Sequence, residues 1–173
     1  MSLSMGASMR PFSVFPVIVA ALLAVSGACA KAPSAESSDV DCAAISDTLR
    51  SLARAFERGI NALDVDSQLR LFSADSDLTW AGDGQLVLMP KDSLGALYRS
   101  VYKSYRKMDF KWDTLRTTVL GPDAGVVTGA GHYSVTDTLG KTERKGVVGT
   151  YVFARRNGMW QLVHGHASHR AMP

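Results

Sequence analysis

Three of the four histidines of this chain lie in its closing segment, and imidazole is the side chain that titrates near neutral pH. The segment runs from Gly158 to His169, behind an Asn-Gly turn signal, and its composition is that of a β-strand. Successive side chains of a strand point to opposite faces. One face is therefore predicted to hold five residues that grade from apolar to polar: Trp160, Leu162, His164, His166 and Ser168. Such a face is typical of the wall of a half-apolar, half-polar pocket.

His166 and His164 are the candidate catalytic residues. They are predicted to lie about 7 Å apart, and a neutral imidazole at either position can take a proton from a carbon acid or position a water molecule. The alternative is structural, with the His166 ring hydrogen-bonded to a neighbour at the mouth of the pocket. His132 is interpreted as a strand-face residue, and His169, on the opposite face of the closing strand, as a solvated one.

Aromatic and polar side chains elsewhere in the chain are predicted to complete the wall of the pocket. A tyrosine hydroxyl in such a wall can donate a hydrogen bond to an oxyanion that develops on a bound molecule. The candidate ligand-binding residues are Trp80, Tyr98, Tyr102, Trp112, His132, Tyr151 and Ser168.

Other kinds of site are not predicted. A catalytic metal needs three protein ligands, and no motif supplies a third ligand beside His164 and His166. Most Asp residues fall at helix caps and turns, and no pair of carboxylates stands out as an acid and a base. The sequence also lacks the motifs of serine nucleophiles, phosphate loops and dinucleotide-binding loops. We therefore expect no metal and no cofactor.

The composition indicates one globular domain with a short appendage. The chain has 173 residues, of which 46% are hydrophobic and 20% charged, and a formal net charge of +3. Its basic and acidic residues are interspersed, whereas a nucleic-acid-binding protein concentrates basic residues on one face. We therefore expect a small-molecule ligand and no nucleic-acid partner.

Residues 1–30 have the pattern of an export signal. Arg10 precedes an apolar run of about 15 residues, which suits a signal peptide and is short for a membrane span. Two cleavage routes stay open. The stretch Ala28-Cys29-Ala30 fits ordinary signal peptidase, whereas Ser26-Gly27-Ala28-Cys29 is similar to a lipobox, although its first residue is Ser where Leu is usual.

The cleavage route decides where the mature protein resides. By the lipobox route Cys29 is lipidated and holds the protein to a membrane, its only predicted membrane attachment. By the ordinary route the protein is periplasmic or secreted. In both cases residues 31–41, rich in Ser, Ala and acidic residues, are predicted to form a flexible tether.

Residues 42–170 are predicted to form one α+β domain. Apolar residues recur at steps of three and four from Ile45 to Leu63, which indicates a long helix capped by Asp41. A short helix capped by Asp66 or Ser67 is expected next. There follow a hairpin over 78–89, a third helix from 90, and strands over 110–120, 125–137, 146–155 and 159–169. Three N-terminal helices packed on a strongly curved antiparallel sheet leave a cone-shaped cavity.

The ordered set of segments resembles the SnoaL-like family of the nuclear-transport-factor-2-like superfamily over residues 43–170. The resemblance implies the cone-shaped fold. It leaves function open, because the superfamily contains isomerases, dehydratases, hydrolases, dimerisation modules and binding proteins. The segments that carry it are Asn61 to Asp66, Leu71 to Asp75, Pro90 to Asp92, Val119 to Ala124, Gly149 to Phe153 and Gly158 to Ser168.

Three functions remain as hypotheses. The first is an exported, non-catalytic domain that binds a small, partly apolar molecule in the cone. The second is a cofactor-independent isomerase, dehydratase or hydrolase that uses His166, with Tyr151 or His164 as a partner. The third is a structural dimerisation module. A homodimer is compatible with all three, because a second copy of the chain can cover the outward apolar face of an antiparallel sheet.

Overall fold

The computed structural model describes residues 41–74, 78–88 and 90–172. The predicted signal peptide, the lipidation of Cys29 and the predicted tether up to residue 40 lie outside these residues. The described chain begins with helix α1 (Cys42–Asn61), and its predicted N-cap is confirmed, since the Asp41 carboxylate accepts a hydrogen bond from the Ala44 backbone N–H at 2.9 Å.

Two shorter helices follow. Leu63 adopts a positive φ of 52° after α1, and Asp64 then accepts the Ser67 N–H at 3.0 Å as the N-cap of α2 (Val65–Leu69). The predicted caps of this helix, Asp66 and Ser67, were therefore wrong by two or three residues. Helix α3 (Lys91–Tyr102) comes after the first two strands. Within the described residues, no helix is long and apolar enough to cross a membrane.

Six strands form one sheet in the order β2-β1-β6-β5-β4-β3, which with the helices confirms the α+β class. The bounds are β1 Thr79–Gly82, β2 Gln85–Leu88, β3 Tyr105–Gly121, β4 Ala124–Asp137, β5 Thr142–Arg156 and β6 Met159–Ala171. One pairing differs from the predicted antiparallel sheet, because β1 lies parallel to β6. By pairing with β6, the β1–β2 hairpin covers an edge that would otherwise present unpaired backbone groups.

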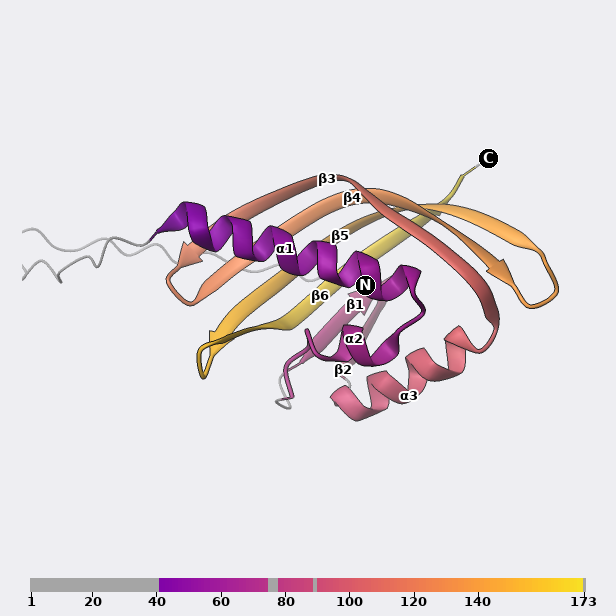
Figure 1. Ribbon diagram of the computed structural model, residues 1–173, viewed down its shortest axis with the longest axis horizontal. Helices are drawn as coiled ribbons and strands as arrows, with labels where there is room; N and C mark the ends of the chain where they lie inside the picture. Colours follow the sequence, from indigo (N-terminus) through magenta and orange to yellow (C-terminus); the bar gives the residue numbers. More distant parts are fainter. Residues whose placement is uncertain (1–40, 75–77, 89, 173) are drawn as a thin grey trace, which may run out of the picture. The chain divides into compact units, whose positions relative to one another are not determined.

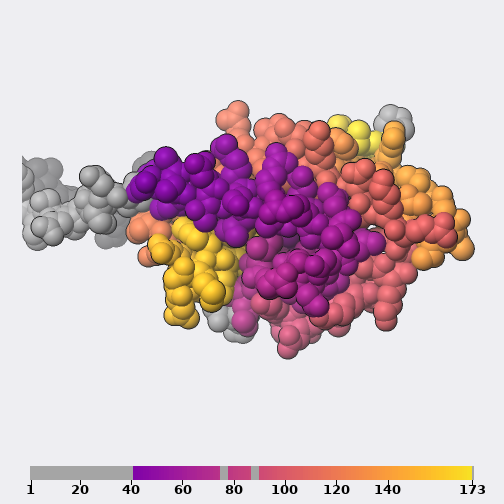
Figure 2. Space-filling view, viewed as in Figure 1, coloured from indigo at the N-terminus to yellow at the C-terminus, as the bar shows by residue number. Residues whose placement is uncertain are grey.

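The sheet is strongly curved, and the helices lie on its inner side. Figure 1 shows the four long strands curving behind and above α1, with α2 and α3 below it. Figure 2 shows α1 and α2, indigo to magenta, packed in front of the sheet. Register shifts interrupt β3 against β4 and β5 against β6, and a bulge bends the strand that carries the extra residue.

The inner side of the sheet divides into a filled part and a hollow part. One part is filled by large, fully buried side chains, among them Leu49, Phe72 and Trp112. Toward the C-terminal end of α1, where β3 begins and β4 ends, the sheet and α3 enclose a cavity. The predicted cone is therefore half core and half cavity.

Candidate ligand-binding cavity

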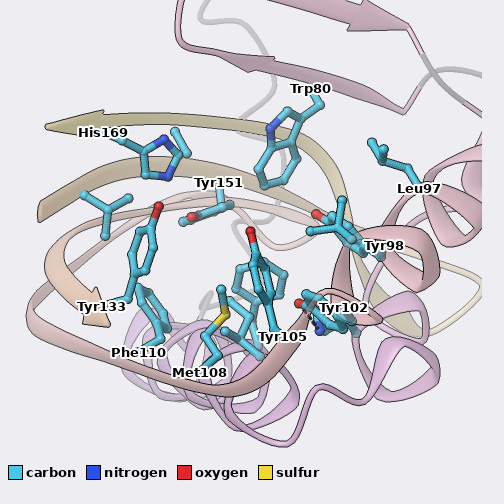
Figure 3. Close-up of a pocket in the computed structure, with 16 residues that line it drawn as sticks. Trp80, Leu97, Tyr98, Tyr102, Tyr105, Met108, Phe110, Tyr133, Tyr151 and His169 are labelled. Carbon is cyan, nitrogen blue, oxygen red and sulfur yellow. Dashed lines mark hydrogen bonds between the residues drawn. The ribbon is translucent and has the colours of Figure 1, made fainter. Parts of the chain in front are cut away.

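The cavity has a volume of about 240 Å³ and lies between the inner face of the sheet and the three helices. Figure 3 shows its labelled side chains directed toward a common space. The lining residues are Phe56, Ile60, Gln68, Trp80, Leu97, Tyr98, Val101, Tyr102, Tyr105, Met108, Phe110, Tyr133, Val147, Tyr151, Ala167 and His169. Apart from tyrosine, His169 is the one titratable side chain among these described residues.

All five tyrosines of the chain line this cavity. Burial raises the pKa of Tyr98, Tyr102 and Tyr151 above the ordinary value, and that of Tyr133 to about 12. These four phenols therefore keep their protons at every physiological pH, and their hydroxyls act as uncharged hydrogen-bond donors.

One polar pair on the helical side of the cavity is already satisfied internally. The Gln68 side chain is only 1% exposed, and its amide nitrogen and oxygen lie 2.7 and 3.0 Å from the Tyr102 hydroxyl. The Tyr102 ring in turn stacks on Tyr98, with centroids 5.9 Å apart and the planes 2° from parallel. Gln68 thus fixes the two rings that α3 presents to the cavity.

Glycines in the sheet make room for the rings that lie on it. A Cβ added to Gly149 would come within 2.6 Å of the Tyr151 hydroxyl, so the Tyr151 side chain lies over its own strand. Tyr151 also contacts Phe56, Trp80 and Trp112 ring to ring, with centroids 5.7 to 6.1 Å apart. It is therefore the central ring between the cavity and the core.

The C-terminal rim of the cavity carries a histidine and a carboxylate. The His169 Nδ1 lies 2.9 Å from Asp83 Oδ2, and the His169 backbone N–H donates to Asp83 Oδ1 at 3.1 Å. The hydrogen bond from His169 holds the pKa of Asp83 below its usual value. Asp83 is therefore ionised near neutral pH and accepts from both donors.

The predicted shared face of the closing strand was wrong beyond Leu162. Phe153 of β5 pairs with Leu162 and Val152 pairs with His164, so Val163 is an extra residue that faces no partner. A single extra residue turns every later side chain to the other face. Trp160 and Leu162 accordingly pack on the core, but the side chains of His164 and His166 lie on the outer face.

Neither predicted catalytic histidine lies at the cavity. His164 Nδ1 is 2.6 Å from the Thr79 hydroxyl, and this hydrogen bond lies on the outer face of the β1–β6 pair. His166 is exposed and pairs across the strands with Ala81 and Thr150. The inward positions of this strand belong instead to Ala167 and His169.

The predicted ligand-binding residues divide into three groups. Trp80, Tyr98, Tyr102 and Tyr151 line the cavity. Trp112 is 1% exposed, and its ring lies in the core against Phe110 rather than in the cavity wall. His132 and Ser168 lie on the outer face of the sheet, where His132 Nδ1 is 2.8 Å from Asp113 Oδ2.

Several cavity residues were not predicted, although the alternation of side chains along the strands identifies some of them. Tyr133 follows His132 directly, so an outward His132 requires an inward Tyr133. Tyr105 and Met108 fall at the start of β3, before the segment that was predicted as a strand, and Phe110 is the first residue of that segment. His169 was placed on the wrong face by the bulge at Val163. Within the described part of the chain, no three His, Cys, Asp or Glu side chains gather as a metal site.

Comparison with known proteins identifies the family. The family of the SnoaL-like domain matches residues 45–173. This chain belongs to the SnoaL-like domain family. This match confirms the predicted resemblance to the SnoaL-like family and the predicted α+β fold. No curated protein matches the chain.

Solved structures similar to this SnoaL-like domain have the same fold at low sequence identity. A nuclear-transport-factor-2-like superfamily protein from Salmonella enterica serovar Typhimurium is 18% identical, with a TM-score of 0.67 over 75% of this chain and 94% of that one. A type 2 hexachlorocyclohexane dehydrochlorinase is 16% identical, with a TM-score of 0.66 over 79% and 94%. A protein of unknown function from Pseudomonas putida KT2440 is 18% identical, with a TM-score of 0.61 over 73% and 87%.

Proposed function

We propose that this SnoaL-like domain binds one small, uncharged, largely apolar molecule in the tyrosine-lined cavity. The observation that carries the proposal is the composition of the lining, in which rings and aliphatic side chains surround about 240 Å³ of space. None of the Asp, Glu, Lys and Arg residues that the structure describes takes part. A charged ligand would lose its hydration without gaining an opposite charge, which is strongly unfavourable.

The size of the cavity limits the ligand. Pockets for drug-sized molecules measure roughly 300–1,000 Å³, so a cavity of about 240 Å³ suits a molecule of one or two rings. The hydroxyls of Tyr98, Tyr133 and Tyr151 can each donate one hydrogen bond to an oxygen of such a molecule. A net contribution of about 0.5–1.5 kcal/mol for each bond makes these groups determinants of orientation more than of affinity.

The test uses one neutral and one anionic probe. Calorimetry and thermal denaturation would compare 2-naphthol with 6-hydroxynaphthalene-2-sulfonate, which has the same ring system and an added anionic group. We expect 2-naphthol to bind and raise the melting temperature, and the sulfonate to do neither. Equal binding of both probes, or binding of neither, would contradict the proposal.

Two neighbouring residues supply matched variants for locating the binding site. Ala167 points into the cavity, whereas Ser168 lies on the outer face. Ala167→Met fills part of the cavity and is expected to reduce 2-naphthol binding at least tenfold. Ser168→Met adds a side chain of the same size outside and is expected to leave binding unchanged. Loss of binding in both variants would place the probe elsewhere.

We also propose that the protein is exported and forms a homodimer. Residues 1–30 have the sequence pattern of a signal peptide, which supports export to the periplasm or cell envelope. The outer face of the sheet leaves Val148 half exposed among the strands β4 to β6, which supports a second copy as its cover.

A further inference from the structure

We infer that the His169 end of the cavity is a recognition site for one hydroxyl group of the ligand, so that the ligand is an alcohol, enol or phenol with an apolar body. The inference rests on the proposed function, because it names the chemical class of the molecule bound in the same cavity.

The orientation of His169 is fixed from the β1–β2 turn. Gly82 pairs with Ala167, so the following residue, Asp83, falls beside His169 at the end of β6. Asp83 has a φ of 47° and lies in the turn before Gly84. Its carboxylate accepts one hydrogen bond from the His169 ring at 2.9 Å and one from the His169 backbone at 3.1 Å. Asp83 therefore holds His169 by two hydrogen bonds, one to its ring and one to its backbone.

This hydrogen bond also decides which ring nitrogen faces a ligand. An ionised carboxylate only accepts hydrogen bonds, so Nδ1 of His169 carries a proton and donates it to Asp83. In a neutral imidazole the other nitrogen, Nε2, then keeps a free lone pair. Within the described residues His169 makes no hydrogen bond through Nε2, and the His169 side chain is 30% exposed at the cavity rim. Nε2 is thus a hydrogen-bond acceptor.

Tyr133 provides a donor at the same end of the cavity. The two rings meet edge to face, with centroids 5.7 Å apart and planes 85° from each other. Figure 3 shows the Tyr133 hydroxyl at the end of its ring nearest to His169. Because burial raises the pKa of Tyr133 to about 12, this hydroxyl stays protonated and donates.

An acceptor and a donor side by side match a hydroxyl group. The hydroxyl oxygen of a ligand can accept from Tyr133 while its hydrogen is donated to Nε2 of His169. An ether or a ketone satisfies only the tyrosine, and a hydrocarbon satisfies neither group. A ligand with one hydroxyl at the end of an apolar ring system therefore satisfies the rim and the body of the cavity together.

The charged groups around the rim do not offer an alternative partner for an anion. Asp83 and Glu143 are two carboxylates whose negative charges interact with the Tyr133 hydroxyl. The positive charge of Lys145, on β5, interacts with the Asp83 carboxylate. Tyr105, on β3, interacts electrostatically with the Tyr133 hydroxyl. None of these four except Tyr105 lines the cavity. The environment therefore favours a neutral hydroxyl over a carboxylate or phosphate.

The outer face contains an internal control for this site. His132 and Asp113 form a similar pair, with Nδ1 and Oδ2 2.8 Å apart and both side chains about half exposed. This pair lies on the convex side of the sheet, away from the tyrosine-lined cavity. The same substitution at His132 and at His169 thus separates a cavity effect from a general effect of losing a His–Asp hydrogen bond.

The experiment compares 2-naphthol with 2-methoxynaphthalene by calorimetry. The methyl ether keeps the ring system and the oxygen but has no hydroxyl hydrogen to donate. We expect the wild-type protein to bind 2-naphthol about 2- to 10-fold more tightly than the ether, the effect of one hydrogen bond. We expect His169→Phe, which keeps a flat ring without an acceptor, to abolish that preference, and His132→Phe to leave it intact.

Equal affinity of the wild-type protein for the two probes overturns the inference and leaves the proposed function standing. Failure of both probes to bind overturns the proposed function as well.

Discussion

The Trp80 indole lies against the backbone of Gly165, so closely that a Cβ added to Gly165 would come within 2.3 Å of the ring. The two residues pair directly across the parallel strands β1 and β6. Only glycine leaves this space, and Trp80 fills it while contacting Phe72 and Tyr151 with ring centroids 6.1 Å away. One wall of the cavity therefore depends on the absence of a side chain.

Gly165→Ala is expected to displace the Trp80 ring and to lower the free energy of unfolding by about 1–3 kcal/mol, the usual effect of overpacking. Urea denaturation followed by tryptophan fluorescence measures this change. Gly121→Ala is the control, because an added Cβ at Gly121 meets no atom within 4 Å. Equal stability of the two variants would show that Trp80 can move at no energetic penalty.

The buried tyrosines predict a loss of stability at high pH. Burial raises the pKa of Tyr151, so the folded protein keeps this proton above about pH 10, where the unfolded chain has released it. The unfolded state then binds fewer protons, and stability falls as pH rises, by up to about 1.4 kcal/mol per pH unit for one such group.

Tyr151→Phe removes this contribution. We expect denaturation midpoints measured between about pH 9 and pH 11.5 to fall less steeply with pH for this variant than for the wild-type protein. Below pH 9 the two pH profiles should run parallel, because neither state releases the Tyr151 proton there. Identical slopes above pH 10 would mean that Tyr151 ionises in the folded state as readily as in the unfolded chain.

The fold class could be predicted because it depends on signals that are local in the sequence. Steps of three and four from Ile45 to Leu63 indicate α1, and the Gly82-Asp83-Gly84 turn indicates the β1–β2 hairpin. The parallel pairing of β1 with β6 could not be predicted, because it joins residues about 85 positions apart, such as Thr79 and His164.

The candidate site could be predicted only in part, and Val163 is the reason. A bulge is a property of two paired strands, set here by Phe153 with Leu162 and Val152 with His164. Nothing in the residue type of valine marks the extra position. Four aromatic residues of the cavity wall were predicted correctly. His164 and His166 were predicted there in place of His169, because the extra residue Val163 reverses the alternation of inward and outward side chains.

The proposed homodimer makes Val148 a test position. Val148 is 51% exposed on the outer face of the sheet, and Leu139 is 93% exposed in the turn after β4. We expect light scattering to find a dimer at micromolar concentration, Val148→Glu to give a monomer because a carboxylate would be buried without a partner, and Leu139→Glu to remain dimeric. A wild-type monomer, or a dimer that tolerates Val148→Glu, would reject this interface.

The predicted export signal fixes the N-terminus of the mature protein. If residues 1–30 are a signal, expression of the full chain in a bacterium should yield a mature protein that begins at Lys31 after ordinary cleavage, or at a lipidated Cys29 after lipoprotein cleavage. Intact mass and cell fractionation distinguish the two routes. If the protein is a lipoprotein, Cys29→Ala should release it from the membrane; if ordinary signal peptidase cleaves it, this variant should not change its location. Cys42→Ala is the control and should change neither outcome, because Cys42 lies in α1, beyond both cleavage sites. An uncleaved cytoplasmic protein that retains Arg10 would contradict export by either route.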